Sequence, residues 1–269
     1  MYQSLRVAIV IPAFNESELL PKTLAGLPDY ADHIIVVDDA STDATLTAAR
    51  ASRDPRLCVL EHPKNGGVGA AIVTGYHHAL TLNVDVVVVV GADAQMDPRE
   101  MSRLLQPILR NDADYVKGDR LGHPDVKCLM PRIRLMGNRI LTLLTRVSSG
   151  YWHVRDSQCG YTAVTADALR LIALNDLYPR YGFPNDVLAK LAEHRLRVMD
   201  QPVTPIYGPE KSGIRISRVI APILWLLLRS GIRRVYRQKH ALGPNRTPQT
   251  TRSDLSETHN QPVRPHHGY

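Results

Sequence analysis

Three short polar segments carry side chains that could bind a metal ion and a phosphorylated ligand. They are Asn15-Glu16, Asp38-Asp39 and the run Gly91-Ala92-Asp93-Ala94-Gln95. Carboxylate and amide oxygens are the ligands that Mg²⁺ prefers, and a divalent ion can bridge them to a diphosphate. Carboxylates also accept hydrogen bonds from the base and ribose of a nucleotide. The three segments together therefore predict a site for a nucleotide diphosphate and a divalent cation.

Each segment alone has a simpler explanation. An aspartate after a strand often caps the next helix, and for Asp38-Asp39 a cap is about as good an interpretation as ligand binding. Asp97, directly before Pro98, also fits the start of a helix. A ligand site therefore requires that the three segments meet at one place.

The apolar pattern indicates how they meet. Strands are predicted over residues 7–11, 34–37, 57–60 and 85–90, with helices over 17–27, from Ser41 or Thr42 to 51, and from the turn at Gly67 to 82. The strand segments are continuous β-branched runs, which indicates parallel strands buried on both faces. Ligands bind outside the carboxyl ends of such strands. We expect an α/β fold with a mostly parallel, doubly wound sheet.

The second half is less regular. Helices are predicted over residues 98–109, 131–147, 166–174 and 184–193, and strands over 113–117, 161–164 and, at a sheet edge, 197–206. Residues 1–215 are expected to form one domain, because 269 residues suit a single α/β unit of generous size.

Charge and cysteine content narrow the setting. The formal net charge is +7, which suits nucleic acid, an anionic membrane or a phosphorylated ligand. No nucleic-acid-binding motif is present, so that partner is not expected. The three cysteines, Cys58, Cys128 and Cys159, form neither a zinc spacing nor a disulfide framework, which favours the cytoplasm.

Residues 216–240 are basic and apolar. The ten residues 219–228 are all apolar, and arginines lie on both sides of them. The run is shorter than the roughly 20 residues that span a bilayer. It suits an amphipathic helix in the membrane interface, peripheral on the inner face of the cell membrane, although a helix packed on the core is the simpler alternative. Residues 241–269 are predicted to be a disordered tail.

Several motifs, taken in their order along the chain, resemble those of family 2 glycosyltransferases of the GT-A fold. They include VIPAFNE, VVDDASTD, NGGVGAA, ADAQMDP, VKGDR, RDSQCGY, FPNDVL and YGPEKSGI, within about residues 5–216. The chain looks similar to bacterial polyprenyl-phosphate sugar transferases of the dolichol-phosphate mannose synthase type. That resemblance implies inverting transfer of a sugar from a UDP- or GDP-sugar donor to a polyprenyl-phosphate acceptor at the membrane surface.

The resemblance also implies site residues. Nucleotide-binding candidates are Pro12, Ala13, Asn15, Glu16, Asp38, Asp39, Gly67, Ala92 and Asp93. Among them, Asp39 is expected to accept a hydrogen bond from the base, with Asp38 beside it. Asp93 and Gln95 would bind Mg²⁺ or Mn²⁺. Family members usually have Asp-x-Asp-x-Gln, and Gly91 stands at the first aspartate position, so one expected carboxylate is missing. Asp97 is the alternative carboxylate, although a helix cap before Pro98 explains it at least as well.

Acceptor-side candidates follow in the second half of the chain. Asp156 is the first candidate for a catalytic carboxylate, and its structural alternative is an ion pair with Arg155 or another basic residue. Asp186 is the second candidate, and its structural alternative is a helix cap. Gln158, Lys211 and Ser212 are expected to bind the acceptor or a phosphate. Basic residues nearby are Lys117, Arg120, Arg132 and Arg134, for most of which a solvated face is the simpler interpretation.

Other functions stay open. The acceptor could be a polysaccharide, a protein or a small molecule. A nucleotidyltransferase would share the strand-end acids, but Pro12-Ala13-Phe14-Asn15 replaces its usual glycine-rich loop. A degenerate family member that binds nucleotide without turnover is the non-enzymatic alternative, which Gly91 keeps open. The donor base, the sugar and the oligomeric state are not decided by any residue.

Overall fold

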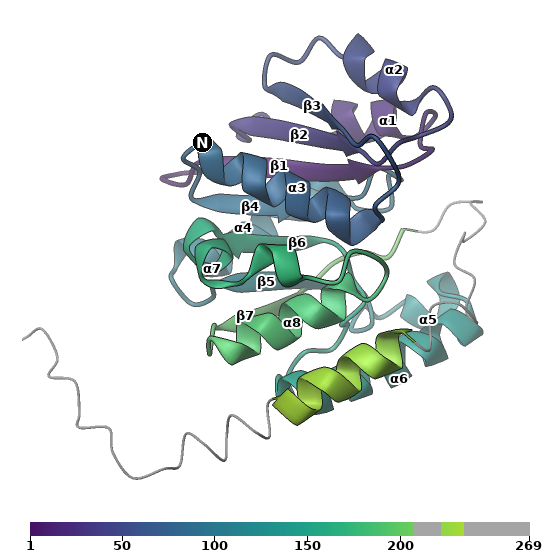
Figure 1. The fold of residues 1–269 in the computed structure, drawn as a ribbon, viewed down its shortest axis with the longest axis vertical. Coiled ribbons are helices and arrows are strands. Elements are labelled where there is room, and N and C mark those ends of the chain that lie inside the picture. Colours follow the sequence, from purple (N-terminus) through teal and green to yellow (C-terminus); the bar gives the residue numbers. More distant parts are fainter. Residues whose placement is uncertain (207–221, 234–269) are drawn as a thin grey trace, which may run out of the picture.

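The computed structural model describes residues 1–206 and 222–233, and Figure 1 shows their arrangement. These residues form one seven-stranded sheet with helices on both faces. The strands are β1 (Val7–Ala13), β2 (His33–Asp38), β3 (Leu57–Glu61), β4 (Val86–Val89), β5 (Tyr115–Asp119), β6 (Thr162–Thr165) and β7 (Val198–Pro202). The helices are α1 (Leu20–Ala25), α2 (Thr45–Ala51), α3 (Val68–Thr81), α4 (Met101–Leu109), α5 (Val126–Leu129), α6 (Arg132–Ser149), α7 (Ala166–Leu171) and α8 (Phe183–Glu193), followed by a helix over residues 222–233.

The strand order is β3-β2-β1-β4-β6-β5-β7. Neighbouring strands are parallel, except that β6 runs antiparallel to both β4 and β5. The predicted α/β class and mostly parallel sheet are therefore confirmed, and β7 lies at the sheet edge as expected. The direction of β6 has no signature in its own four residues, because the long connection before it decides how the strand enters the sheet.

The central strands are buried on both faces. On one face, Ile9 and Ile11 of β1 pack with Leu104 and Leu105 of α4. On the other face, Val10 packs in a second cluster that includes residues of α3 and α8. Burial on both sides explains why these strands are continuous apolar runs in the sequence.

The antiparallel strand brings a later part of the chain to the ligand edge of the sheet. Val89, at the carboxyl end of β4, pairs with Thr162, at the amino end of β6. The loop before β6 therefore lies beside the loop after β4. As a result, residues near 156–161 and residues 91–95 meet although they are far apart in the sequence.

Two helices begin later than predicted. The backbone N–H groups of Glu16 and Ser17 donate to Thr45 Oγ1 (2.7 Å) and Asp43 Oδ2 (3.2 Å), and α1 starts only at Leu20. The expected cap of α2 by Ser41 or Thr42 is wrong, since α2 starts at Thr45 and the Asp43 carboxylate accepts from the Thr45 N–H at 2.9 Å. Loop-to-loop bonding replaces helix capping here.

The C-terminal predictions are described only in part. Lys211 and Ser212 lie outside the described residues, as do residues 241–269. Of the segment 216–240, residues 222–233 are described and are helical. Among the helices of the described ranges, none has the length and apolar character needed to cross a membrane.

Candidate active site

The loops after β1 and β2 are hydrogen-bonded to each other. Asn15 has a left-handed backbone (φ 56°), which asparagine tolerates better than most residues. Its N–H donates to Ser41 Oγ (3.0 Å), and its side-chain oxygen accepts from the Thr42 N–H (2.8 Å). The Asp39 N–H donates to the Ala13 carbonyl at 2.8 Å. Asn15 therefore holds the two loops together at the ligand edge.

Asp39 binds the protein's own third loop. One carboxylate oxygen accepts from the Gly66 N–H (2.8 Å) and contacts His62 Nδ1 (2.7 Å), and the other accepts from the Gly67 N–H (2.7 Å). The residue is only 2% exposed. Its carboxylate shapes the turn before α3 and does not cap α2.

Asp38 differs from its neighbour. Its Oδ2 accepts from the Ser41 N–H (3.1 Å), whereas its Oδ1 is buried and has no hydrogen-bond partner among the described residues. A buried carboxylate oxygen without a donor is uncommon, because such groups lose their hydration and gain nothing in exchange. Asp38 Oδ1 is therefore a place where a ligand donor or a water molecule would be stabilising.

Gly67 allows a close approach between two segments. Its φ is +99°, and a Cβ there would lie 2.6 Å from the Pro179 carbonyl oxygen. That carbonyl accepts from the Ala70 N–H in the first turn of α3 at 3.0 Å. Gly67 is thus needed for packing between α3 and the loop before α8.

The loop after β4 presents Asp93 and Gln95. Ala92 is buried, and its carbonyl accepts from Thr23 Oγ1 at 3.1 Å, which ties the loop to α1. Asp93 Oδ1 accepts from the Gln95 N–H at 3.1 Å across the intervening Ala94, which has φ 54°. A Cβ on Gly91 would lie 2.8 Å from Asp93 Oδ1. Gly91 therefore leaves room for the position that the Asp93 side chain adopts.

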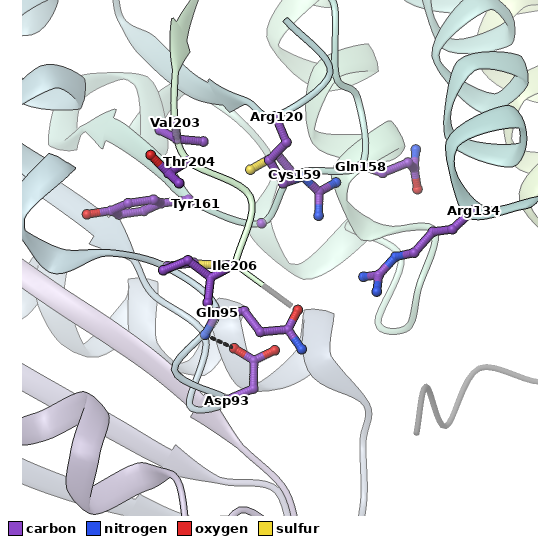
Figure 2. Close-up of a pocket in the computed structure, with 12 residues that line it drawn as sticks. Asp93, Gln95, Arg120, Arg134, Gln158, Cys159, Tyr161, Val203, Thr204 and Ile206 are labelled. Atoms are coloured by element: carbon purple, nitrogen blue, oxygen red, sulfur yellow. Dashed lines mark hydrogen bonds between the residues drawn. The ribbon is translucent and has the colours of Figure 1, made fainter. Parts of the chain in front are cut away.

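A pocket of about 170 Å³ opens at this loop. Its walls come from the loop after β4, the loop between β5 and α5, helix α6, the loop before β6 and the segment after β7. The lining residues are Asp93, Gln95, Met96, Arg120, Arg134, Gln158, Cys159, Gly160, Tyr161, Val203, Thr204 and Ile206. Figure 2 shows Asp93 and Gln95 on one wall, with Arg120, Arg134 and Gln158 on the side away from them. Carboxylate and guanidinium groups thus face one cavity, which suits a ligand that carries both a metal-binding and a free phosphate group.

Asp156 lies behind this wall and is paired with Arg120. Its side chain is 0% exposed, and its oxygens accept from Arg120 Nε (2.7 Å), Arg120 Nη2 (3.1 Å) and the Gln158 N–H (3.1 Å). Burial opposes its ionisation, but the Arg120 guanidinium, Lys117 and the Gln158 N–H together outweigh that effect and hold the pKa of Asp156 below its usual value. The partner is Arg120 and not the adjacent Arg155, which pairs with Asp119 at 3.4 Å.

Gln158 is oriented by a buried polar network. Its side-chain N–H₂ donates to Ser157 Oγ (2.8 Å) and Asn185 Oδ1 (3.1 Å). Asn185 in turn donates to Thr145 Oγ1 of α6 at 2.6 Å, and the Ser157 N–H donates to Thr142 Oγ1 at 3.1 Å. The inner face of α6 therefore fixes a residue of the pocket.

Asp186 is not brought to the pocket lining. It lies in the first turn of α8, where it is 7% exposed and its Oδ2 accepts from the Tyr178 N–H at 2.9 Å. Burial raises the pKa of this carboxyl group, and the Tyr178 hydrogen bond only partly offsets that effect. The hydrogen bond holds the loop before α8, so this carboxylate has a structural task of its own.

Lys117 and Asp200 are two further charged residues near the loop that forms this wall of the pocket. Lys117 of β5 is 0% exposed and donates to the Cys159 carbonyl, and burial lowers its pKa. Asp200 of β7 accepts from the Arg155 N–H (2.5 Å), its other oxygen has no partner among the described residues, and burial raises its pKa to about 6. Lys117 thus supports the main chain of the pocket wall and is not among the residues that line the pocket.

The donor set for a metal ion is small. Within the described residues, no three His, Cys, Asp or Glu side chains gather in a way that could hold a cation. Asp93 and Gln95 offer one carboxylate and one amide oxygen in the same pocket. Mg²⁺ often takes only one or two carboxylates and completes its shell with phosphate oxygens and water. These residues therefore fit a cation that binds together with a diphosphate.

Comparison with known proteins identifies the family. The sequence model described as Glycosyl transferase family 2 matches residues 8–172, more than half of the chain. The chain belongs to the family 2 glycosyltransferases. This glycosyltransferase is 35% identical over 205 residues to an undecaprenyl-phosphate mannosyltransferase from Micrococcus luteus, covering 74% of this chain and 83% of that protein. It is 29% identical over 216 residues to a UDP-N-acetylglucosamine–dolichyl-phosphate N-acetylglucosaminyltransferase from Methanococcus voltae, covering 75% and 86% respectively.

Solved structures agree on the fold of this glycosyltransferase. Glucosyl-3-phosphoglycerate synthase from Mycobacterium tuberculosis, in complex with Mn²⁺, UDP and glucosyl-3-phosphoglycerate, superposes with a TM-score of 0.68. The alignment covers 85% of this chain and 80% of that one, at 19% identity. The expected GT-A fold is therefore confirmed, and at this identity the likeness concerns the fold alone.

The pocket of this glycosyltransferase contains some of the predicted residues and adds others. Asp93, Gln95 and Gln158 line it together, whereas Asp156 stands behind Arg120 and Asp186 supports a loop. Arg120 and Arg134 line the pocket although a solvated face was the simpler expectation for such residues. The missed lining residues are Met96, Cys159, Gly160, Tyr161, Val203, Thr204 and Ile206. Most of these are apolar or small, and only their place in the fold distinguishes them.

Proposed function

We propose that this glycosyltransferase moves a sugar from a UDP- or GDP-sugar to a polyprenyl phosphate at the membrane surface, with inversion at the anomeric carbon. The observation that carries the proposal is the pocket in which Asp93 and Gln95 face Arg120 and Arg134. The names of two relatives support it, since one is an undecaprenyl-phosphate mannosyltransferase and the other a dolichyl-phosphate N-acetylglucosaminyltransferase.

The donor belongs on the Asp93 side. Asp93 and Gln95 would hold Mg²⁺ or Mn²⁺ together with the donor diphosphate, and the cation would offset the charge that the leaving nucleotide diphosphate gains. Pro12, Ala13, Glu16 and Ala92 lie at the same sheet edge and remain the proposed walls of the nucleotide site. We assign hydrogen bonding of the base to Asp38, because Oδ1 of that residue lacks a partner whereas both oxygens of Asp39 bind the Gly66–Gly67 turn.

The acceptor phosphate belongs on the arginine side. A guanidinium group binds phosphate oxygens through paired N–H donors, and two such groups would hold the acceptor next to the donor sugar. One phosphate oxygen attacks the anomeric carbon while the bond from that carbon to the donor diphosphate breaks. The nucleotide diphosphate leaves with the electron pair, and the new glycosyl bond forms on the opposite face.

This reaction needs no strong base, because a phosphate monoester is already ionised near neutral pH. Asp156, buried and bonded to Arg120, therefore acts by positioning the guanidinium and not by proton removal. Asp186 remains the second candidate for a base, and Lys211 and Ser212 remain proposed phosphate contacts. A peripheral location at the membrane follows from the lipid acceptor, and the inner face of the cell membrane is part of the same proposal.

A transfer screen tests the proposal. Purified protein is incubated with UDP- and GDP-sugars carrying a labelled sugar, with and without Mn²⁺ and with and without polyprenyl phosphate. We expect label to enter the lipid fraction with one nucleotide class, and only when both Mn²⁺ and the lipid phosphate are present. Label that appears in polysaccharide, in protein or in a water-soluble product would reassign the acceptor.

The degenerate alternative has its own outcome in the same experiment. If Gly91 has cost the protein its activity, nucleotide diphosphate binds in the presence of Mn²⁺ but no donor is consumed under any condition. Calorimetry on the same samples separates that result from a protein that does not bind nucleotide at all.

A further inference from the structure

Helix α6 carries its apolar side chains on the outside. Ile133, Met136, Ile140, Leu143 and Val147 recur at intervals of three and four residues and are 53–74% exposed. This spacing places them on one face of a helix. In a soluble protein such a face normally points to the core.

The inner face of α6 is mostly polar instead, and its one buried apolar residue is Leu135, which packs with Val126 and Met130. Thr142, Thr145, Ser148 and Ser149 are buried at 5% exposure or less. Thr142 and Thr145 bond to Ser157, in the network that orients Gln158. Most apolar side chains of α6 are therefore exposed, while four of its five buried side chains are polar.

The helix over residues 222–233 extends the apolar face. Its residues Leu224, Trp225, Leu228 and Ile232 are 45–64% exposed, whereas Ile223, Leu226 and Leu227 are buried. A Cβ built on Gly231 would lie 3.9 Å from Ser148 Cα, so this helix lies against the end of α6. Figure 1 shows the two helices side by side at the end of the molecule beyond β7. We call the outer surface of residues 132–149 and 222–233 the two-helix face.

The charges around this face have one sign. Helix α6 contains four arginines and residues 222–233 contain two, and neither segment contains an aspartate or glutamate. Arg132, Arg139, Arg229 and Arg233 are exposed, and Arg229 lies over the Trp225 ring at 5.4 Å from its centroid. An apolar centre with a rim of arginines and an aromatic ring complements an anionic lipid surface. Two copies meeting through this face would instead bring like charges together.

We propose that the two-helix face docks on an anionic lipid bilayer and that α6 is its main element. The apolar stripe would lie among the acyl chains near the headgroups, and the arginines would contact lipid phosphates. The inference deepens the proposed function, on which it rests only for the identity of the acceptor.

The placement of α6 has a consequence for the pocket. Arg134, in the first turn of α6, lines the pocket, while Ile133 beside it is 74% exposed on the two-helix face. Docking would therefore bring the guanidinium side of the pocket next to the surface in which a lipid phosphate is embedded. Thr142 and Thr145, on the same helix, hold the network at Gln158.

Vesicle binding by the full chain tests the proposal, with no sugar donor or polyprenyl phosphate present. The protein is sedimented with vesicles of phosphatidylglycerol and phosphatidylcholine, or of phosphatidylcholine alone. We expect binding to the anionic vesicles and a loss of about tenfold or more in affinity for Leu143→Glu. The matched control is Leu171→Glu in α7, since both leucines are 54% exposed on a helix and Figure 1 places α7 away from α6. The control should bind as the wild type does.

Tryptophan fluorescence gives a second readout. The chain has two tryptophans, Trp152 and Trp225, so Trp152→Phe leaves Trp225 as the single reporter. Its emission should shift to shorter wavelength with anionic vesicles and be quenched by brominated lipids. Emission unchanged by vesicles would overturn the proposed contribution of residues 222–233.

Three results would overturn the proposal as a whole. Leu143→Glu and Leu171→Glu could affect vesicle binding equally while both variants keep the wild-type unfolding midpoint. Sedimentation could show a dimer that Leu143→Glu dissociates, which would assign the face to a second copy. Vesicle binding that arises only after removal of residues 234–269 would assign the face to that segment. Sugar transfer to detergent-solubilised polyprenyl phosphate, measured separately, shows whether the proposed activity stands in each case.

Discussion

Asp93 and Asp156 are two carboxylates of one site with different surroundings. Asp93 lines the pocket beside Gln95. Asp156 is fully buried, and its oxygens accept hydrogen bonds from Arg120 and from the Gln158 N–H. A carboxylate that faces the cavity can meet a ligand directly, whereas one that is saturated by protein donors acts through the group it holds. Substitutions at the two positions should therefore fail in different ways.

Asp93→Asn should lower sugar transfer by about 100-fold or more and weaken Mn²⁺-dependent nucleotide binding, because the one acidic oxygen donor of the proposed metal site is lost. Stability should change little, since an asparagine oxygen can still accept from the Gln95 N–H. Steady-state transfer rates and calorimetry measure the two effects.

Asp97→Asn is the matched control for Asp93→Asn. Asp97 lies in the same loop but accepts from the Arg99 N–H at the start of a 3-10 helix, a cap that asparagine also provides. Its transfer rate should stay within a few-fold of wild type. Equal losses of transfer rate in the two variants would contradict the proposed role of Asp93 as a metal ligand.

Asp156→Asn should reduce both stability and turnover more than Asp186→Asn. Loss of one partner leaves the partly buried Arg120 without its ion pair, and breaking a buried pair costs about 3 kcal/mol or more. Asparagine at 186 resembles the protonated carboxyl group that burial already favours there. Urea unfolding gives the stability difference, and a rise in acceptor KM separates a displaced Arg120 from a lost base. The opposite order of effects would make Asp186 the catalytic carboxylate.

Asp200 should make stability depend on pH in the direction opposite to an ordinary salt bridge. Burial raises its folded pKa to about 6, whereas the unfolded value is near 3.9. The folded state therefore binds more protons between these values, and the stability from this group, complete below about pH 4, is lost as pH rises through 6. The wild-type free energy of unfolding should fall by about 1 to 3 kcal/mol over this interval relative to Asp200→Asn. Parallel curves for the two proteins would contradict this.

For individual residues, the sequence predicts where the aspartates lie in the fold but not which group each carboxylate binds. Asp38, Asp39 and Asp93 can be placed at strand ends from the apolar pattern alone. Which oxygen remains without a partner depends on the Gly66–Gly67 turn and on the Ser41 N–H, and both reach the aspartates through loop conformations. Arg120 and Asp156 are 36 residues apart and meet only because β6 turns back into the sheet.

The glycines Gly75 of α3 and Gly137 of α6 have different surroundings. Gly75 of α3 lies directly over Val10 of β1, and a Cβ there would overlap the valine side chain. Gly137 of α6 has nothing within 4 Å of its Cβ position. The first glycine lets a helix approach the sheet closely, while the second only adds conformational freedom to the unfolded chain.

Gly75→Ala should therefore destabilise the protein by about 1 to 3 kcal/mol, because the added methyl group forces α3 away from β1. Gly137→Ala should stabilise it by about 0.5 to 1 kcal/mol, since alanine favours the helix and meets no neighbour. Thermal and urea unfolding measure both. Effects of the same sign would contradict the packing described for α3.

Element order and type are largely predictable, because continuous apolar strands and periodic helices leave strong patterns. The prediction of a helix over residues 131–147 is confirmed by α6, but its sequence does not show that the apolar face points outward. That follows only from the polar partners of Thr142 and Thr145. Likewise α1 and α2 start late because the loops before them bond to each other, which is not visible within either segment.

On the scale of the whole molecule, the ligand edge of the sheet and the two-helix face meet at α6. Its Arg134 lines the pocket, and its outer stripe supplies five of the nine exposed apolar residues named for the two-helix face. The sequence predicts membrane contact through residues 216–240, with basic residues such as Arg132 and Arg134 on the same side of the molecule. The structure adds α6 as a candidate for that contact, since two helices remote in sequence are neighbours in the fold.

The proposed role of the pocket is to bring a nucleotide-sugar donor together with a lipid phosphate. The most direct measurement is the amount of labelled sugar that the wild type, Asp93→Asn and Arg134→Gln each transfer into polyprenyl phosphate with Mn²⁺ and the donor found in the screen. The wild type should form a lipid-linked sugar of inverted anomeric configuration. Asp93→Asn should form almost none, and Arg134→Gln should need a several-fold higher lipid concentration. Equal amounts of product from all three proteins, or retention of configuration, would contradict the account.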